Sequence, residues 1–295
     1  MIELGAEAAE ALADFRPVVA LETTLVAHGF PAGEGLEVAL EAERRVRAGG
    51  AVPATIGVLD GAIRVGLSRA ELERFAEAGS SALKTGPREL GLAVARRALG
   101  ATTAGGTLAV CALTGIRFLA TGGIGGVHRG FARHPDVSAD LGELARSEAL
   151  VVCSGVKSLL DVPATLEALE TLGVPVLGWQ SETLPLFYSA HGGPPVPARV
   201  DSLAEAAALA RAHWSLRRGG LLLARPPAES LEAEPLFAAA LEAANAAGIR
   251  GAALTPFALA HVHRASGGAS IRVNKGLIAD NAQLAAELAV AYASG

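Results

Sequence analysis

The chain has little of several residue types, and each shortage excludes a class of protein. Only two cysteines, Cys111 and Cys153, occur among its 295 residues, so the sequence has neither a disulfide framework nor a cysteine-rich zinc site. Both lie in apolar runs, which predicts small buried side chains. The net charge is −5 and the pI is near 5.8, so the chain lacks the basic surface that nucleic-acid binding requires.

Segments that would direct the chain to a membrane are missing as well. No uninterrupted apolar run reaches the roughly 18 residues of a membrane-spanning helix. Residues 1–20 contain acidic side chains and no basic region ahead of an apolar stretch, which argues against a secretory signal peptide. We therefore expect a cytoplasmic protein without membrane or nucleic-acid partners.

Aromatic residues are rare and lysine is rarer. Aromatics make up 4% of the chain and hydrophobic residues 51%, so Ala, Leu and Val must fill the core. Among 25 basic residues the only lysines are Lys84, Lys157 and Lys275. Lys157 follows an apolar strand-like run. It either lays its stem on apolar surface with its ammonium in water, or it is an amine nucleophile, a role closed to arginine because arginine stays protonated.

Short β-rich runs alternate with longer Ala-, Leu- and Glu-rich segments, a pattern typical of α/β proteins. Several runs are continuously apolar, as expected for strands covered on both faces. Asp60-Gly61 between two of them favours a hairpin turn, so antiparallel pairing is also expected. The sequence therefore predicts a three-layer α/β/α fold with a mixed, largely parallel central sheet, in a single domain over residues 1–295.

The expected strands cover residues 17–23, 54–61, 62–67, 116–123, 149–155, 174–179 and 220–225. The expected helices cover residues 34–48, 69–78, 88–98, 102–114, 139–147, 161–172, 202–217, 231–247, 256–266 and 274–293. The Pro- and Gly-rich segment 189–202 is expected to be a surface loop that acts as a lid or a boundary.

Glycine concentrates in residues 99–107 and 120–141. Neither segment has the Gly-Lys-Ser/Thr of a Walker loop or a GxGxxG turn between strand and helix, so a dinucleotide site is not expected. In the second segment four glycines follow a predicted strand, and glycine lets backbone N–H groups approach an anion closely. This segment is either an ordinary flexible loop or an anion or metal site.

Polar residues follow these glycines. His128 comes first, and Asp136 and Asp140 precede a predicted helix for which Ser138 is a candidate N-cap. A helix N-terminus favours phosphate. If a metal binds, carboxylate oxygens and water suit Mg²⁺ or Mn²⁺ better than zinc.

Three charged residues stand at the ends of predicted strands. Glu22 ends an apolar run, as an exposed residue or as a proton donor, while Lys84 and Lys157 each follow such a run. Ligands of open α/β sheets bind at the carboxyl edge, so we expect these residues and the glycine loop to share a pocket. His261 and His263 point to different faces of a predicted helix, and we interpret them as surface residues.

Seven segments of the chain carry longer and more specific patterns. They are VALETTLVAHGFP (19–31), ATIGVLDGAIRVGL (54–67), GATTAGGT (100–107), IRFLATGGIGGVHRG (116–130), DVSADLGELA (136–145), VVCSGVKSLLDVPATLEALETLGVPVLGW (151–179) and, more loosely, the run 255–289. In this order they resemble the pseudouridine-5′-phosphate glycosidase family, which includes the indigoidine synthase A-like proteins. The run Thr85-Gly86-Pro87-Arg88 departs from the family pattern.

The resemblance implies an activity, a metal and an assembly. The activity is reversible cleavage of the C–C glycosidic bond of pseudouridine 5′-phosphate into uracil and ribose 5-phosphate. The metal is a divalent ion, typically Mn²⁺, and the assembly is a homotrimer with an α/β/α fold. Such a bond has no leaving-group oxygen to protonate, so a pair of carboxylates alone is poorly suited to break it, whereas a lysine Schiff base supplies an electron sink.

The resemblance also implies a role for each matching residue. Lys157 is the expected nucleophile, which forms a Schiff base with C1′ of ring-opened ribose, and Glu22 is the expected proton donor. Asp136 is expected to hold the metal. The expected substrate contacts are Lys84, Ala104 through its backbone, Ser138, Ala139, Asp140, His128 and Asn281.

Two other functions remain open at this point. A Schiff-base aldolase or other lyase on sugar phosphates would use the same lysine without a metal, so a chelator separates it from the first hypothesis. A non-catalytic sugar-phosphate sensor would keep its binding when Lys157 is replaced by alanine, and would show no turnover.

Overall fold

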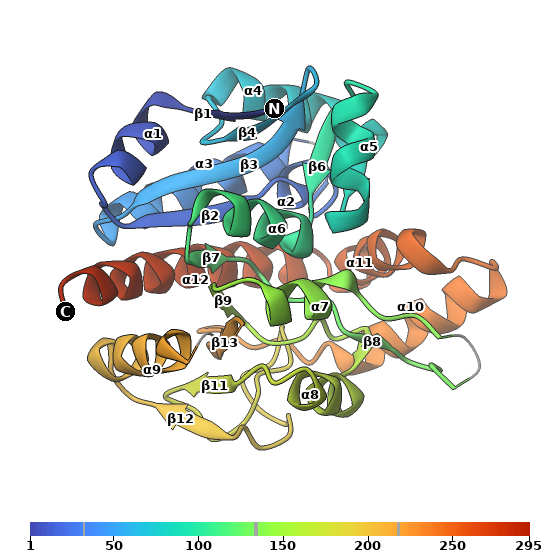
Figure 1. The fold of residues 1–295 in the computed structure, drawn as a ribbon. Coiled ribbons are helices and arrows are strands. Elements are labelled where there is room, and N and C mark those ends of the chain that lie inside the picture. The colour runs from blue at the N-terminus through green and yellow to red at the C-terminus, as the bar shows by residue number, and fades with distance from the viewer. Residues whose placement is uncertain (32, 133–134, 217–218) are drawn as a thin grey trace.

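A mixed, mostly parallel β-sheet forms the centre of the protein, whose computed structural model describes residues 1–31, 33–132, 135–216 and 219–295 (Figure 1). Within these ranges one sheet has eleven strands. Along its main path the order is β1 (Ile2–Leu4), β4 (Ala62–Val65), β3 (Val52–Leu59), β2 (Val18–Glu22), β7 (Phe118–Ala120), β9 (Leu150–Cys153), β13 (Leu221–Ala224), β11 (Val176–Trp179) and β12 (Ala198–Val200). Off this path, β6 (Gly100–Thr102) pairs with β3 and carries β5 (Leu83–Thr85) on its other side.

The predicted mixture of strand directions is confirmed. Of the described strand pairs in this sheet, only β3–β4 and β3–β6 are antiparallel. Between β3 and β4, Asp60 and Gly61 both have positive φ, 52° and 88°, as a two-residue hairpin turn of the primed type requires. The turn residues therefore determine where the one hairpin predicted from the sequence forms.

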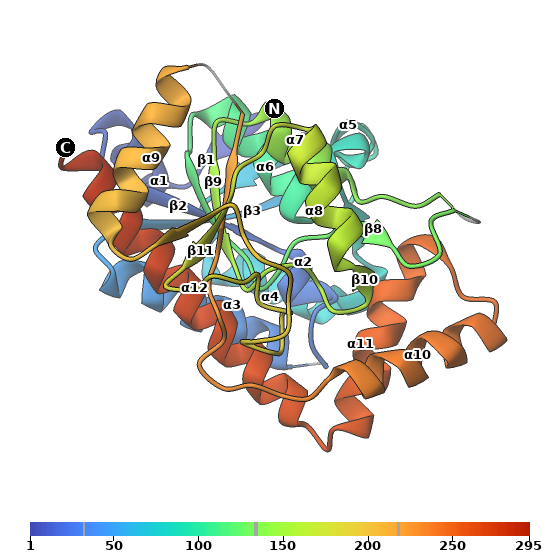
Figure 2. The same cartoon turned by 90° about the horizontal axis from the view of Figure 1, so that it is seen from below.

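Helices cover both faces of the sheet, which gives the predicted three layers (Figure 2). One face carries α3 (Glu34–Ala48), α9 (Leu203–Ser215) and α12 (Ala269–Ala293), and the other carries α6 (Ala104–Thr114), α7 (Ala139–Arg146) and α8 (Val162–Thr171). Every residue of β2, β3, β9 and β13 is buried, as their continuous apolar sequences predict.

The remaining described elements lie around these layers. They are α1 (Ala6–Ala13), α2 (Thr24–Ala27), α4 (Arg69–Ala78), α5 (Leu90–Ala95), α10 (Glu234–Ala246), α11 (Leu254–Ala265), the short pair β8 (Val127–His128) and β10 (Leu160–Asp161), and 3-10 turns at Gly79–Ser81, Pro87–Glu89 and Gly251–Ala253. No helix in the described part of the chain combines the length and the apolar character needed to cross a membrane.

Three of the aromatic residues cluster where three elements meet. Phe118 of β7, Trp214 of α9 and Tyr292 of α12 form edge-to-face contacts with ring centroids 5.2–6.1 Å apart. The guanidinium of Arg117 lies 5.3 Å from the Trp214 ring centroid. Because aromatic pairs add specific geometry to burial, this cluster fixes α9 and α12 against the sheet. Cys111 and Cys153 are buried and free, as predicted.

Long elements agree with the sequence better than short ones. The helices predicted at 34–48 and 69–78 have the same bounds in the structure. The sequence analysis missed the helix α1. It also missed four strands of three residues each, because such short strands show too little periodicity: β1, β5, β6 and β12. The last of these strands falls in the predicted loop 189–202. The end of the helix predicted at 202–217 lies outside the described residues.

The prediction that His263 is a surface residue is wrong. Its side chain is buried between α11 and the start of α12, and Nδ1 lies 2.7 Å from the Ser270 hydroxyl. His261 on the same helix is half-buried. The sequence did not show that the side of the helix carrying His263 packs against the start of α12. Burial lowers the pKa of His263 below its ordinary value.

This buried histidine makes stability depend on pH. Below about pH 6.5 the unfolded chain binds a proton at His263 that the folded chain resists, so stability falls as the pH falls. We expect the thermal midpoint to drop between pH 7 and pH 5, and His263→Asn to lose part of this dependence. His261→Asn is the matched control and should keep it. An unchanged pH dependence in His263→Asn would contradict the assignment.

Candidate active site

The three central strands bring the predicted catalytic residues to one edge of the sheet. β2, β7 and β9 are parallel neighbours, so their carboxyl ends place Glu22, Thr121 and Ser154 side by side. The carboxylate of Glu22 is only 3% exposed. One of its oxygens accepts the hydroxyl of Thr24 and the other accepts the hydroxyl of Thr121. Glu22 is therefore a buried, oriented carboxylate at the end of its strand, as one of the two readings of the sequence expected, while a pocket shared with Lys84 and Lys157 stays a prediction.

Asn281 joins the last long helix to two of these strand ends. It lies on α12 and is fully buried. Its Nδ2 donates to the carbonyl of Thr121 at 2.9 Å and to the hydroxyl of Ser154 at 3.1 Å. A continuous polar chain therefore leads from Glu22 through Thr121 to Asn281 and Ser154.

Lys157 stands on a tight loop after β9. Its backbone N–H donates to the carbonyl of Ile124 at 3.2 Å, and the N–H of Ile124 donates to the carbonyl of Gly155 at 3.1 Å. Gly155 has a φ of 85°, and a Cβ there would lie 2.1 Å from the carbonyl oxygen of Pro185, so only glycine fits. The Lys157 side chain is half-buried. No described residue forms an ion pair or hydrogen bond with its ammonium, which leaves the amine available.

Lys84 lies among the other charged residues that the sequence singled out. Burial lowers the pKa of Lys84, and the charge of Lys157 lowers it further, while Asp140, Glu22 and Asp136 act in the opposite direction. Lys84 is part of β5, opposite Ala101 of β6. The two lysines and three carboxylates therefore belong to one electrostatic neighbourhood, although they are far apart in the sequence.

His128 belongs to the same neighbourhood. Burial lowers its pKa, Asp136 raises it and Lys84 lowers it further, with burial the largest effect. The His128 Nε2 lies 3.8 Å from an Asp136 carboxylate oxygen, and the backbone N–H of His128 donates to the carbonyl of Asp136. A neutral imidazole beside a carboxylate can donate or accept one hydrogen bond at each ring nitrogen.

Asp140 braces the two glycine segments. Its carboxylate is buried; Oδ1 accepts the N–H of Gly105 and Oδ2 accepts the N–H of Gly125, each at 2.8 Å. The anion bound by the glycine loop is thus a carboxylate of the protein itself. The loop packs closely against the start of α7, because a Cβ at Gly125 would lie 2.3 Å from the hydroxyl oxygen of Ser138.

Ser138 and Ala104 begin two helices at this edge. Ser138 is the N-cap of α7, where its hydroxyl accepts the N–H of Asp140 at 3.2 Å, as predicted. Ala104 opens α6 after the cap Thr103, whose N–H donates to the carbonyl of Thr85 at 3.0 Å. Both helix N-termini direct partial positive charge toward this edge. The substrate contacts expected of Ser138, Ala139, Asp140 and Ala104 stay predictions.

The residues present suit a weakly caged metal ion. The side chain of Asp136 is 41% exposed, and in the described residues no three His, Cys, Asp or Glu side chains gather as a metal cage. Mg²⁺ and Mn²⁺ keep several waters and are held by one or two carboxylates together with substrate phosphate, so Asp136 fits such an ion. Arg133 and His134 of the predicted segment lie outside the described residues.

Several residues of this site were not recognised in the sequence. Thr24 and Thr121 orient Glu22 through hydrogen bonds, and Ser154 accepts a hydrogen bond from Asn281. The signal available was position: Thr24 directly follows the strand predicted at 17–23, and Thr121 and Ser154 lie near the ends of the strands predicted at 116–123 and 149–155. His28 was also missed; burial lowers its pKa and the charge of Lys84 lowers it further.

Comparison with known proteins identifies the class. The chain matches the family described as Indigoidine synthase A like protein over residues 7–291 and belongs to this family. A solved structure of an indigoidine synthase A-like protein from Thermotoga maritima superposes with a TM-score of 0.88 at 36% identity, covering 98% of this chain and 96% of that one.

Relatives within the family carry more particular names. The chain is 51% identical to a pseudouridine-5′-phosphate glycosidase of Herpetosiphon aurantiacus, over 98% of this chain and 97% of the relative, and 48% identical to that of Chloroflexus aurantiacus, over 98% of both. The structure of the prealnumycin C-glycosynthase AlnA, in complex with ribulose 5-phosphate, superposes with a TM-score of 0.91 at 39% identity, over 100% and 97% of the two chains.

Because Asp140 accepts two backbone N–H groups, we predict that replacing it lowers the stability of the protein. In Asp140→Asn the new amide group faces one of the two backbone N–H donors, which then loses its acceptor. We expect the free energy of unfolding to fall by about 1–3 kcal/mol, measured by urea denaturation. Asp201→Asn, at an exposed ion pair with Arg199, should change it by no more than about 0.5 kcal/mol. Equal effects of the two substitutions would exclude the brace.

Proposed function

We propose that the protein is a pseudouridine-5′-phosphate glycosidase, which reversibly cleaves pseudouridine 5′-phosphate to uracil and ribose 5-phosphate. The observation that carries the proposal is the unpaired, half-buried Lys157 beside Lys84 and the buried Glu22 at one sheet edge. Full-length relatives at 51% and 48% identity with this name support it. The homotrimer implied by the family resemblance belongs to the same proposal.

The chemistry uses the amine of Lys157 and the oriented carboxyl group of Glu22, which follow neighbouring strands of the same sheet edge. Glu22 donates a proton to the ring oxygen of the ribose, and the sugar ring opens. The amine of Lys157 bonds to C1′, and the electrons of the C1′–C5 bond pass to uracil, which takes up a proton at C5. The remaining Schiff base on Lys157 is hydrolysed by water, which releases ribose 5-phosphate and restores the amine. The sum is the addition of one water.

The surrounding residues orient this reaction. Thr24 and Thr121 hold the two oxygens of Glu22 and so fix the direction in which its proton leaves. Lys84 and the N-terminus of α6 offer positive charge to the phosphate. Asp136 would hold a divalent ion such as Mn²⁺, which when bound neutralises phosphate charge. The buried Asn281 fixes the strand ends on which these groups stand.

Replacing the nucleophile tests the reaction directly. Lys157→Met is expected to lower uracil release from pseudouridine 5′-phosphate by at least about 1,000-fold, because in this mechanism Lys84, the other lysine of this edge, serves the phosphate and not C1′. Lys275→Met is the matched control, since Lys275 is paired with Glu34 on the surface, and it should keep wild-type activity. Uracil release that survives Lys157→Met would refute this mechanism.

Removal of metal separates the proposal from an aldolase. Treatment with a chelator should abolish uracil release and added Mn²⁺ should restore it, while Asp136→Asn should require a higher Mn²⁺ concentration for half-maximal activity. Asp201→Asn, on the surface, is the control and should show the wild-type Mn²⁺ dependence. Activity that persists undiminished in the chelator would favour a metal-independent Schiff-base lyase instead.

A second candidate function is C-glycoside synthesis on another acceptor. It is favoured by the likeness to the prealnumycin C-glycosynthase at 39% identity. The same lysine and carboxylate would serve in that direction, because each step of the mechanism is reversible. Incubation of ribose 5-phosphate with uracil and with other aromatic acceptors, followed by mass spectrometry of the products, compares the two functions.

A further inference from the structure

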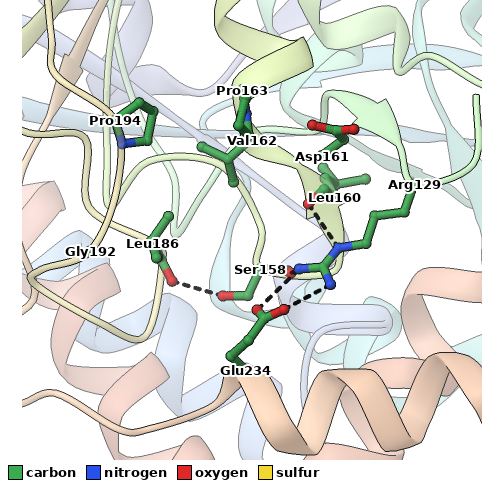
Figure 3. A pocket seen from close by; sticks show the side chains of 10 residues that line it. All are labelled: Arg129, Ser158, Leu160, Asp161, Val162, Pro163, Leu186, Gly192, Pro194 and Glu234. Atoms are coloured by element: carbon green, nitrogen blue, oxygen red, sulfur yellow. Dashed lines mark hydrogen bonds and ion pairs between the residues drawn. The ribbon is translucent and has the colours of Figure 1, made fainter.

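Arg129 reaches from the strand of His128 to the residues that follow Lys157. Its Nη2 donates to the carbonyl of Ser158 at 2.9 Å, and its Nε donates to the carbonyl of Leu160 at 3.2 Å (Figure 3). In the short sheet formed by β8 and β10, His128 stands directly opposite Leu160. Arg129 therefore joins the two segments that carry the predicted nucleophile and the predicted substrate-contacting histidine.

The same guanidinium binds a third element. Its Nη1 and Nη2 donate to the two carboxylate oxygens of Glu234, at 2.8 Å and 3.0 Å. Glu234 is the first residue of α10, which lies outside the layers (Figure 2). The planar fork of arginine can serve a carboxylate and two carbonyls together, whereas the ammonium of lysine cannot match that geometry.

A cavity lies on one side of these bonds. It has a volume of about 370 Å³, and the described residues that line it include Arg129, Ser158, Leu186 and Glu234. On its other side the loop is fixed by the bond from the Lys157 N–H to Ile124 and by the Ser158 hydroxyl, which donates to the carbonyl of Leu186 at 2.7 Å. Arg129 is thus the polar anchor of the loop toward the cavity.

We propose that Arg129 is a positioning residue for the reaction. Its two bonds to backbone carbonyls fix the loop of Lys157 relative to His128, and its pair with Glu234 fastens α10 to the same loop. The inference rests on the proposed function. The carbonyl bonds carry the effect, because the side chains of Arg129 and Glu234 are 37% and 60% exposed, and an ion pair so exposed is weakened by water.

Four variants test the inference. In Arg129→Gln we expect kcat for uracil release to fall on the order of 10- to 100-fold, as a shift of the nucleophile by about 1 Å would cause, with a smaller change in KM. Arg129→Lys should fall between this variant and the wild type. Glu234→Gln should lose less than about fivefold. Arg272→Gln breaks another exposed arginine–glutamate pair, with Glu229, and should keep wild-type kinetics.

A second readout follows the nucleophile itself. Borohydride in the presence of ribose 5-phosphate traps the Schiff base, and mass spectrometry locates the adduct on Lys157. The trapping rate of Arg129→Gln should fall by about the same factor as kcat, while its circular dichroism spectrum stays that of the wild type. If this variant does not fold, Arg129→Lys, which keeps the charge and most of the stem, decides the question.

Distinct outcomes overturn distinct claims. Wild-type trapping rates in folded Arg129 variants would overturn the positioning role. A loss of kcat in Glu234→Gln as large as that in Arg129→Gln would show that the ion pair, and not the carbonyl bonds, carries the effect, and would overturn the inference as stated. Failure of the wild-type protein to release uracil or to trap ribose 5-phosphate would refute the proposed function, and this inference with it.

Discussion

The parallel pairing of β2, β7 and β9 is the constraint on which the rest of the structure depends. Parallel neighbours end at the same edge, so their ends meet whatever the distance between them in the sequence. Glu22 and Lys157 are 135 positions apart in the sequence. Glu22 nevertheless ends β2 and Lys157 lies on the loop after β9, so both lie at this edge of the sheet. The helices on each face, the glycine loop and the polar chain to Asn281 all attach to these three strands.

Buried polar groups at this edge of the sheet form hydrogen bonds with one another, and these bonds hold the edge in one arrangement. Asp140 takes two backbone N–H donors, Glu22 takes two hydroxyls, and Asn281 binds the carbonyl that follows β7. In a buried setting an unpaired polar group is costly, whereas a fully paired network holds one arrangement. Among the described residues, the amines of Lys157 and Lys84 have no such partner at this edge. A preorganised frame around unengaged amines is an arrangement that suits the proposed reaction.

Features of the fold that depend on neighbouring residues could be predicted from the sequence, whereas features that depend on contacts between distant segments could not. Local signals were sufficient for the Asp60-Gly61 turn, for the Ser138 cap and for the helix at 34–48, because each rests on neighbours in the chain. The sequence placed Glu22 and Lys157 at strand ends, but the order of the strands came only from the structure. The burial of His263 was missed because it depends on packing against α12.

Other features of the site were suggested by a sequence motif but could be explained only from the structure. The glycine run from 122 to 126 suggested an anion site, and the structure shows that the anion held there is Asp140. The threonines around Glu22 looked ordinary in the sequence, because a hydroxyl gains its role only from the group it faces. Short edge strands such as β1 and β12 are defined by partners that lie elsewhere in the chain, so periodicity alone did not reveal them.

The position of Asn281 has a consequence for how the protein is made. This residue closes the polar chain behind Glu22 from α12, a helix that also carries Tyr292 of the aromatic cluster and follows every described strand of the sheet in the sequence. A ribosome must therefore synthesise all of these strands before the polar chain can close. The end of β2 acquires its final surroundings only when α12 docks.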